Sequence, residues 1–489
     1  MDEPWHFAYV QYAAEHHGLF PGQAKFISKE VDQFLKIHPA SWSVQQNSSL
    51  VQTYENYWAQ SEETRNVTNN TIRELRFTGE YEEASGDLAA QYEGHQPPGY
   101  YLIAAPVFAL ASKSFSFTST FLLVRIWTLL IASLVVPGIF ALTRLISSEP
   151  QSNNTMLIAA LFPGFYPGVV RVSNDALMAV LACWLFVALI AYLKLQRSGY
   201  LYCCAALMAA GLWTKAFFVP ILAGSLLILL LYRKFRPALI LFLVSILGWP
   251  WYVLNLYHSG AITGLPETVQ SHITLADSFH ALPRLDWDNL FKVLRSSHIW
   301  IGNWSFLGIR SWMYRSVFWL FILGVFGWIR KPRQLLDRTV LPLIILYITF
   351  LAALVYYATQ VFLHTGLTVA EGWYLTSFIP IESVFFTLGA LILLGKHARW
   401  LIGLFELLCL TIAVYSSLFV AMPYYSGFTY HKASGSLTTF HPALPDFVQM
   451  MEKLMRYETG IPQIVPWLLL SIFVFVGGYR IVRENSRSA

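Results

Sequence analysis

The sequence predicts an all-α polytopic membrane protein, and three observations support this: its composition, its apolar runs and the positions of its basic residues. Of the 489 residues, 56% are hydrophobic and only 12% are charged, which is too apolar for a soluble globular protein. The formal charge is +5, but Lys and Arg stand in short clusters between apolar runs, as topology determinants do. We therefore expect membrane lipids and no nucleic acid as partners. All four cysteines lie inside apolar segments, so the polar loops contain no disulfide framework and no CxxC metal site.

About eleven apolar runs are candidates for crossing a membrane, at about 20 residues per crossing. They lie at 121–145, 156–170, 176–195, 200–213, 217–232, 238–256, 316–329, 340–362, 374–394, 401–421 and 465–481.

Basic clusters between these runs set the expected orientation. They are Arg144, Lys194/Arg197, Arg233/Lys234/Arg236, Arg330/Lys331/Arg333, Lys396/Arg399 and Arg480/Arg483. The positive-inside rule places them all in the cytoplasm, so an even number of crossings must separate consecutive clusters. This requirement splits 199–232 into two short helices that meet near Thr214 and Lys215, and it makes 156–195 a hairpin turning at 172–175. The chain then consists of one inward crossing followed by five hairpins.

This topology divides the chain into regions that alternate between the outer side and the membrane. They are an outer N-terminal region (1–116), a transmembrane module (117–256), an outer loop (257–315), a second transmembrane module (316–421), an outer loop (422–464) and a last helix with a cytoplasmic tail (465–489). Because no apolar run stands ahead of 1–116 to carry it across, we expect a further helix to precede the sequence, giving about twelve in total. A translocated N-terminal tail is the alternative. The membrane would be a plasma (inner) membrane with the site facing outward, or the endoplasmic reticulum membrane in a eukaryote.

Three segments of the outer regions are expected to form helices near the membrane surface. Residues 23–38 have apolar side chains at helical spacing opposite charged ones, which is typical of a surface helix or of a helix packed in a small outer subdomain. Residues 99–111 follow Pro97-Pro98, a favourable helix start, but are too short to span. Residues 446–457 are the third candidate.

Ionisable residues concentrate at the outer ends of the predicted helices, where water or a partner can reduce the cost of burying charge. They are Asp2, Glu3, His6, Glu93, His95, Arg125, Arg171, Asp175, Lys215 and Glu371. Only Glu382 falls at mid-span. We interpret it as an acid inside the bundle that shares a proton or hydrogen bond with a neighbouring helix, although a transporter would also place such a group there.

Several short strings in this order resemble motifs of the GT-C superfamily of membrane glycosyltransferases, specifically the relatives of protein O-mannosyltransferases and aminoarabinose transferases (glycosyltransferase family 39-like). The strings span about three quarters of the chain. They are the acidic motif at Asp2-Glu3, the HxPP-Y-L motif at His95-Gln96-Pro97-Pro98 with Tyr100 and Leu102, an arginine at Arg125, the turn Ser173-Asn174-Asp175-Ala176, and the TK motif Thr214-Lys215. The resemblance implies a GT-C fold.

Two features depart from that family's pattern. The first transmembrane helix of the family is absent, which places Asp2 directly after Met1. The late RYL motif appears as Trp373-Tyr374-Leu375, with tryptophan in place of arginine. This substitution puts in doubt the donor-phosphate contact that an arginine would make, or the class of donor.

The resemblance implies an inverting glycosyltransferase that transfers a sugar from a polyprenyl-phosphate donor to a glycan, lipid or protein acceptor on the extracytoplasmic side. Asp2 would be the catalytic base, assisted by Glu3. The residues implied to bind the donor phosphate or sugar are Lys215, Arg125, Arg171, His95, Gln96, Asp175 and Tyr374. The alternatives are a transporter of a lipid or small solute, and a catalytically inactive relative that binds lipid carriers.

A DxD string, Asp286-Trp287-Asp288, lies in the second outer loop. Such a string can bind a metal ion, but residues 285–294 also match the start of an Asp-capped amphipathic helix. We prefer the helix start and expect neither a metal nor another cofactor.

Overall fold

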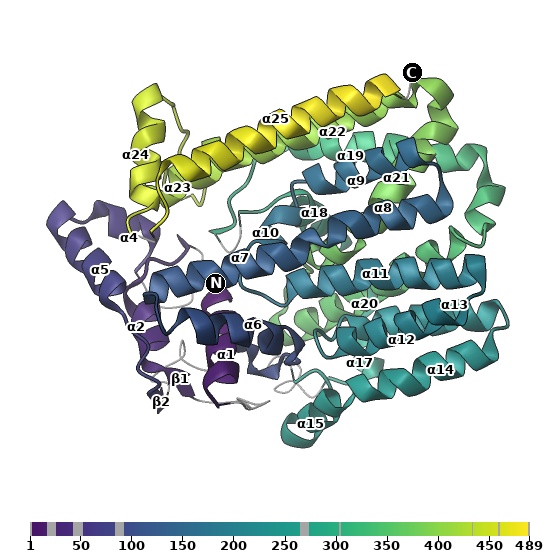
Figure 1. The fold of residues 1–489 in the computed structure, drawn as a ribbon, viewed down its shortest axis with the longest axis horizontal. Coiled ribbons are helices and arrows are strands. Elements are labelled where there is room, and N and C mark those ends of the chain that lie inside the picture. The colour runs from purple at the N-terminus through teal and green to yellow at the C-terminus, as the bar shows by residue number, and fades with distance from the viewer. Residues whose placement is uncertain are drawn as a thin grey trace.

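The computed structural model describes residues 2–16, 26–42, 52–83, 92–264, 273–302, 305–432, 434–457 and 460–487. Within these residues the fold is a bundle of helices with one small antiparallel sheet, in which β1 (Phe26–Ser28) pairs with β2 (Tyr81–Glu83). The long helices run side by side along the longest axis, and the N-terminal elements gather at one end together with α24 (Leu444–Leu454) (Figure 1). The expected all-α class is therefore confirmed.

The end of the bundle that carries the N-terminal elements is built from short helices. They are α1 (Glu3–His16), α2 (Lys29–Ile37), α4 (Tyr54–Ala59), α5 (Glu62–Glu74), η1 (Tyr92–His95) and α6 (Gly99–Ala111). The guanidinium of Arg73 donates to the carbonyl oxygen of Arg456 at 2.9 Å, and His431 and Glu55 lie 2.8 Å apart. These contacts tie the regions 1–116 and 422–464 together.

The first half of the bundle comprises nine helical segments after α6. They are α7 (Phe117–Ser133), α8 (Val135–Ile146), α9 (Glu149–Leu161), α10 (Phe165–Val169), α11 (Asp175–Leu195), α12 (Ser198–Leu212), α13 (Phe218–Leu231), α14 (Phe235–Ser245) with η2 (Ile246–Gly248), and α15 (Pro250–Ser259). Two expectations are confirmed here. Residues 199–232 form two short helices that meet at Thr214 and Lys215, and the chain turns between α9 and α11 around residues 172–175.

The second half continues the bundle and returns towards the C-terminus. Its elements are α17 (Leu275–Ala281), η3 (Leu282–Arg284), α18 (Trp287–Ile299), α19 (Ser311–Phe326), η5 (Gly327–Arg330), η6 (Pro332–Leu336), α20 (Leu341–Thr365), η7 (Gly372–Phe378), α21 (Ile379–Leu394), η8 (Gly395–His397), α22 (Ala398–Ser416), a π-helical turn η9 (Ser417–Ala421), α23 (Met422–Tyr425), α24 and α25 (Ile464–Arg487).

The number of membrane spans differs from the sequence expectation. Among the described residues, six helical segments are long and apolar enough to cross a membrane, or seven if the bent pair α14–α15 is one span. The chain is a multi-pass membrane protein, but a count of eleven is not confirmed. Several local features explain the difference. Helices α12 and α13 have only 15 and 14 residues, the run 156–170 is divided between α9 and α10, and α14 and α15 meet at an angle of 53° at Trp249-Pro250, where proline cannot continue a straight helix. The runs 374–394 and 401–421 both fall in the single helical segment Gly372–Tyr425 of 54 residues.

The predicted basic clusters are close to one another in space. Lys194 donates to the carbonyl oxygen of Leu145 at 2.6 Å, Lys234 donates to Gln196 at 2.6 Å, and Arg330 donates to the carbonyl oxygen of Leu393 at 2.7 Å. Each bond joins one cluster to the neighbourhood of the next. These bonds bring the first three clusters together and place Arg330 next to the helix end that precedes Lys396.

The helices differ strongly in how much of their surface lies inside the protein. Of the most apolar stretch of 18 residues in α11, 83% is buried inside the protein, whereas the corresponding share in α25 is 6%. Helix α11 is therefore the central helix, and α25 lies against the outside of the bundle (Figure 1).

The amphipathic helix expected at 23–38 is shorter than predicted and packs within the outer region. The structure has α2 at Lys29–Ile37, capped by the Ser28 side chain, while residues 23–25 lie outside the described part. Phe34 packs on Phe117 of α7, with ring centroids 5.1 Å apart, and Glu30 is buried. A buried acid does not suit a helix on the membrane surface, so the subdomain interpretation holds. The helices expected at 99–111 and 446–457 are present as α6 and α24.

Candidate active site

Helix α1 carries the first acidic motif into the middle of the N-terminal region (1–116). Phe7, Tyr9 and Val10 are fully buried, and the ring of Tyr9 stacks on that of Tyr101 in α6, with centroids 3.7 Å apart. Because packing holds this helix on several sides, Asp2 at its start has a defined position.

Glu3 is tied to two other segments. It accepts two hydrogen bonds from Arg125 of α7, at 2.6 and 2.5 Å, and a third from the backbone N–H of Val172 at 2.8 Å. Burial alone would raise the pKa of Glu3, but the Arg125 guanidinium and the Val172 N–H outweigh it and lower the pKa. Because its carboxylate is hydrogen-bonded to Arg125 and to the Val172 backbone, Glu3 fixes the position of α1.

Four charged residues form a continuous chain of alternating sign next to Glu3. Asp2 accepts from Arg171 at 3.1 Å, and Arg171 also donates to Asp175 at 3.1 Å. The second carboxylate oxygen of Asp175 accepts from the ammonium of Lys215. All four side chains are at least four-fifths buried. We call Asp2, Arg171, Asp175 and Lys215 the charged chain; it joins α1, the turn before α11 and the α12–α13 junction.

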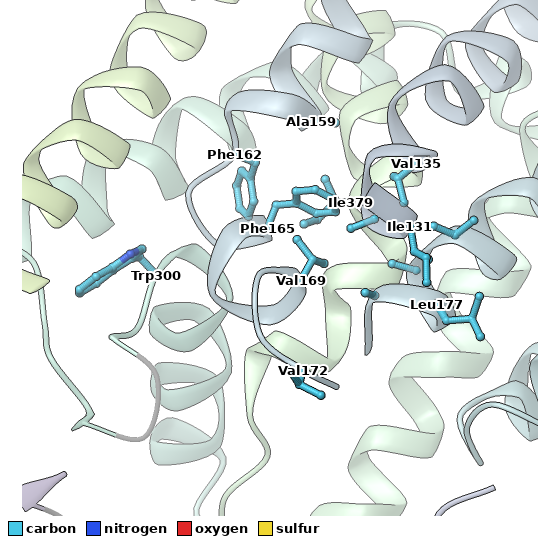
Figure 2. Packing of buried hydrophobic residues seen from close by; sticks show 14 of the residues in the cluster. Ile131, Val135, Ala159, Phe162, Phe165, Val169, Val172, Leu177, Trp300 and Ile379 are labelled. Atoms are coloured by element: carbon cyan, nitrogen blue, oxygen red, sulfur yellow. The ribbon is translucent and has the colours of Figure 1, made fainter. Parts of the chain in front are cut away.

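Apolar packing fixes the turn that carries Arg171 and Asp175. Val169 and Val172 on this turn are fully buried, and Figure 2 shows Phe165 and Val169 of α10 in the same core as Ile379 of α21. The turn is therefore anchored from both sides of Arg171. Such anchoring holds charges in place at low reorganisation cost.

His95 and Gln96 lie beside the charged chain and are connected to it through Asn174. The side-chain amide of Asn174 donates to Gln96 at 3.1 Å and to the carbonyl oxygen of Thr214 at 3.2 Å. Gln96 in turn contacts the His95 ring nitrogen at 3.1 Å. The structure thus brings together the three strings around residues 95, 174 and 214, which the sequence analysis treated as one constellation.

Gly99 allows the loop after Pro97-Pro98 to approach the α12–α13 junction closely. Its N–H donates to the carbonyl oxygen of Trp213 at 2.6 Å, and a Cβ atom here would lie 2.6 Å from that same oxygen. The atoms that this Cβ would meet first belong to the backbone of Trp213, which cannot move aside easily.

Replacing Gly99 with alanine is expected to destabilise the protein by about 1–3 kcal/mol, the usual cost of overpacking. The measurement is the apparent unfolding midpoint of the detergent-solubilised protein. Gly199→Ala is the matched control, because a Cβ atom at Gly199 meets nothing within 4 Å. Equal midpoints for the two variants would contradict the prediction.

Tyr374 is near the charged chain but reaches it through another aromatic residue. Its ring packs edge-on against Phe217, at 4.8 Å between centroids, and the ammonium of Lys215 lies 5.3 Å from the centre of the Phe217 ring. Tyr374 and Phe217 together form an aromatic wall next to Lys215.

His6 and Glu93, which stand among the ionisable candidates of the sequence without an assigned role, also belong to this site. The Nε2 atom of His6 lies 4.0 Å from Asp2 Oδ2 and 3.8 Å from Glu93 Oε1. Burial lowers the pKa of His6 to about 3, while burial and then the Asp2 charge raise the pKa of Glu93 to about 8. The spacing of His6 four residues after Asp2 was the available signal, since this spacing places both on one face of a helix.

The DxD string forms a helix start, as preferred above. Asp286 caps α18 by accepting from the backbone N–H of Asn289 at 3.0 Å, and Asp288 is exposed in the first turn.

Glu382 lies in the first turn of α21 and has two hydrogen-bond partners. His298 of α18 and Tyr347 of α20 each lie 2.7 Å from one of its carboxylate oxygens. The interpretation as an acid bonded to a neighbouring helix is therefore confirmed.

The pair of His298 and Glu382 predicts a pH-dependent stability. Burial lowers the pKa of His298, but the Glu382 carboxylate raises it by more, so the pKa lies above its ordinary value. The stabilisation is complete below the unfolded-state pKa of about 6.5 and is lost as the pH rises through the folded-state value. We expect the thermal unfolding temperature of the wild type to decrease as the pH is increased beyond about 6.5. In His298→Gln this decrease should be absent. An unchanged pH profile in the variant would refute the assignment.

No model of a protein family matches the chain, and no curated protein matches it. Two crystal structures of ArnT from Cupriavidus metallidurans are similar at 13% identity. The apo structure has a TM-score of 0.43, covering 89% of this chain and 72% of that one. The structure bound to undecaprenyl phosphate has a TM-score of 0.44, covering 81% and 67%. At these scores the likeness is weak, and nothing about the site follows from it.

Proposed function

We propose that this protein is an inverting glycosyltransferase that moves a sugar from a polyprenyl-phosphate carrier to a hydroxyl or amine of a glycan, lipid or protein acceptor. The observation that carries the proposal is the charged chain, in which Asp2 stands at one end and Lys215 at the other. Buried carboxylates that alternate with buried cations suit a reaction that needs one proton acceptor and one positively charged binding site for a phosphate.

The reaction would proceed by direct displacement at the anomeric carbon. The acceptor oxygen or nitrogen forms a bond to that carbon while the bond to the phosphate oxygen breaks, and the acceptor proton passes to Asp2. A phosphate is a weak base and leaves without protonation, so one carboxylate suffices, whereas a glycosidase usually needs a pair. Arg171, at 3.1 Å, orients the Asp2 carboxylate for this step.

Lys215 and Arg171 would stabilise the charge that develops on the departing phosphate. Fixed cations are effective here because they need little reorganisation during the reaction. Both cations contact Asp175, and this carboxylate fixes their positions. A donor phosphate would contact the same two cations, and the negative charge of Asp175 would offset the repulsion between them.

An apolar cavity of about 470 Å³ has Val170, the residue before Arg171, among its lining residues. Tyr166, Trp300, Tyr425 and Phe473 are among its lining residues, and its polar groups are few. An isoprenoid chain attached to a phosphate near Arg171 would fit an apolar space in this position.

Mass spectrometry of lipids that copurify with the protein tests the proposal. We expect a polyprenyl phosphate or its sugar conjugate in the wild type and much less in Ala413→Phe, which fills the cavity at a lining residue. Val476→Phe is the matched control, on an exposed face of α25. Bulk phospholipid alone in the wild type, together with no transfer from synthetic polyprenyl-phosphate sugars, would refute the proposal.

A further inference from the structure

We propose that Asp2, His6 and Glu93 form a binding site for a divalent transition-metal ion. One ligand atom from each of the three side chains lies within 4.8 Å of the other two. For metal bonds of about 2.1 Å, ligand atoms in a tetrahedral site stand about 3.4 Å apart. The separations of His6 Nε2 from the two carboxylates are 4.0 and 3.8 Å, and the two carboxylates lie within 4.8 Å of each other, so all three side chains would draw closer together around an ion.

The imidazole of His6 is already oriented for this role. Its Nδ1 atom lies 2.8 Å from the hydroxyl of Tyr101, and only 3% of His6 is exposed. When Nδ1 carries the proton and donates to Tyr101, the lone pair of Nε2 faces the two carboxylates. A hydrogen bond from the second ring nitrogen is the usual support of a metal-binding histidine.

Glu93 supplies an independent observation. Its side chain is 4% exposed, and its Oε2 atom is buried with no hydrogen-bond partner among the described residues. A buried carboxylate oxygen without a donor is costly. A cation at His6 Nε2 would compensate for that cost, since it would stand next to the same carboxylate.

The ligand set indicates which ions fit. One imidazole nitrogen and two carboxylates suit Zn²⁺ or Mn²⁺ and offer no sulfur for softer metals. Three protein ligands leave at least one position open, as in catalytic rather than structural zinc sites. The open position would accept an oxygen ligand such as a hydroxyl or a phosphate oxygen. The site shares Asp2 with the proposed sugar transfer, but metal binding can be measured without any sugar donor, so the two proposals can fail separately.

The test uses the full-length protein in detergent, treated with EDTA and then titrated with Mn²⁺ or Zn²⁺ in the absence of any sugar donor. We expect one high-affinity site, and ¹⁴N coupling in pulsed electron paramagnetic resonance of the Mn²⁺ form, because His6 would bind the ion directly. Absence of nitrogen coupling in the wild type would overturn the proposal and requires no variant.

Substitutions locate the site. His6→Gln and Glu93→Gln should each weaken binding by about 100-fold, and Tyr101→Phe by about 10-fold, since it removes only the support of the ring. Asp288→Asn is the control, because it removes an exposed carboxylate of the DxD string. Unchanged affinity in Glu93→Gln, or loss of binding in Asp288→Asn, would contradict the assignment. A proton shared between Asp2 and Glu93 in place of an ion would appear as no metal uptake, which also overturns it.

Discussion

Asp2→Asn is expected to lower kcat for sugar transfer by about 10²–10⁴-fold, the usual contribution of a general base. Asparagine has nearly the same shape and can still accept a hydrogen bond from Arg171, which lies 3.1 Å from Asp2, but it cannot take a proton from the acceptor. The donor KM should change little, because the cations of the charged chain remain. Steady-state kinetics with a synthetic polyprenyl-phosphate sugar would measure both constants.

The matched control for this experiment is Asp32→Asn. Asp32 also lies in the outer N-terminal region, where it pairs with Lys36 four residues later on α2. We expect wild-type kinetics from it. Full activity in Asp2→Asn would remove Asp2 from the reaction, and equal losses in both variants would point to a general effect of charge on this region.

Lys215→Met is expected to lower kcat by about 10²–10³-fold, comparable with the loss of one group that stabilises developing charge. Methionine retains most of the aliphatic length of lysine but leaves Asp175 with Arg171 as its remaining charged partner. Lys215→Arg should restore part of the rate, because it keeps the charge with a different geometry. The pattern of strong loss and partial rescue separates a charge effect from a packing effect.

Lys194→Met provides the control for the lysine substitution. Lys194 belongs to a basic cluster and donates to the backbone of Leu145, away from the charged chain. Its variant should keep the wild-type kcat. If Lys194→Met and Lys215→Met lost activity equally, the proposed contact of Lys215 with phosphate would be wrong.

The sequence predicted well those parts of the fold that depend on local chemistry. Pro97-Pro98 marks the start of α6, and the requirement for even crossings located the break between α12 and α13 at Thr214-Lys215. The number of spans was less predictable. Hydropathy shows where apolar helices exist, but the bend between α14 and α15 and the short length of α12 depend on how neighbouring helices pack.

The candidate site could be predicted as a set of residues but not as a set of contacts. Asp2, Arg171, Asp175 and Lys215 are distant in the chain, and their pairing arises only from tertiary packing. For the same reason the sequence could not show that Glu3 is occupied by Arg125, or that His6 and Glu93 meet at Asp2. Roles assigned to single residues from short strings remain predictions until such contacts are known.

The position of the charged chain along the polypeptide bears on how such a protein can diversify. All four residues come from the first 215 positions, whereas the long loops after them, at 257–315 and 422–464, contribute none of the four. Substitutions in those later loops would leave the four charges in place, but Trp300 and Tyr425 of the same loops line the apolar cavity, so the loops can alter what that cavity holds.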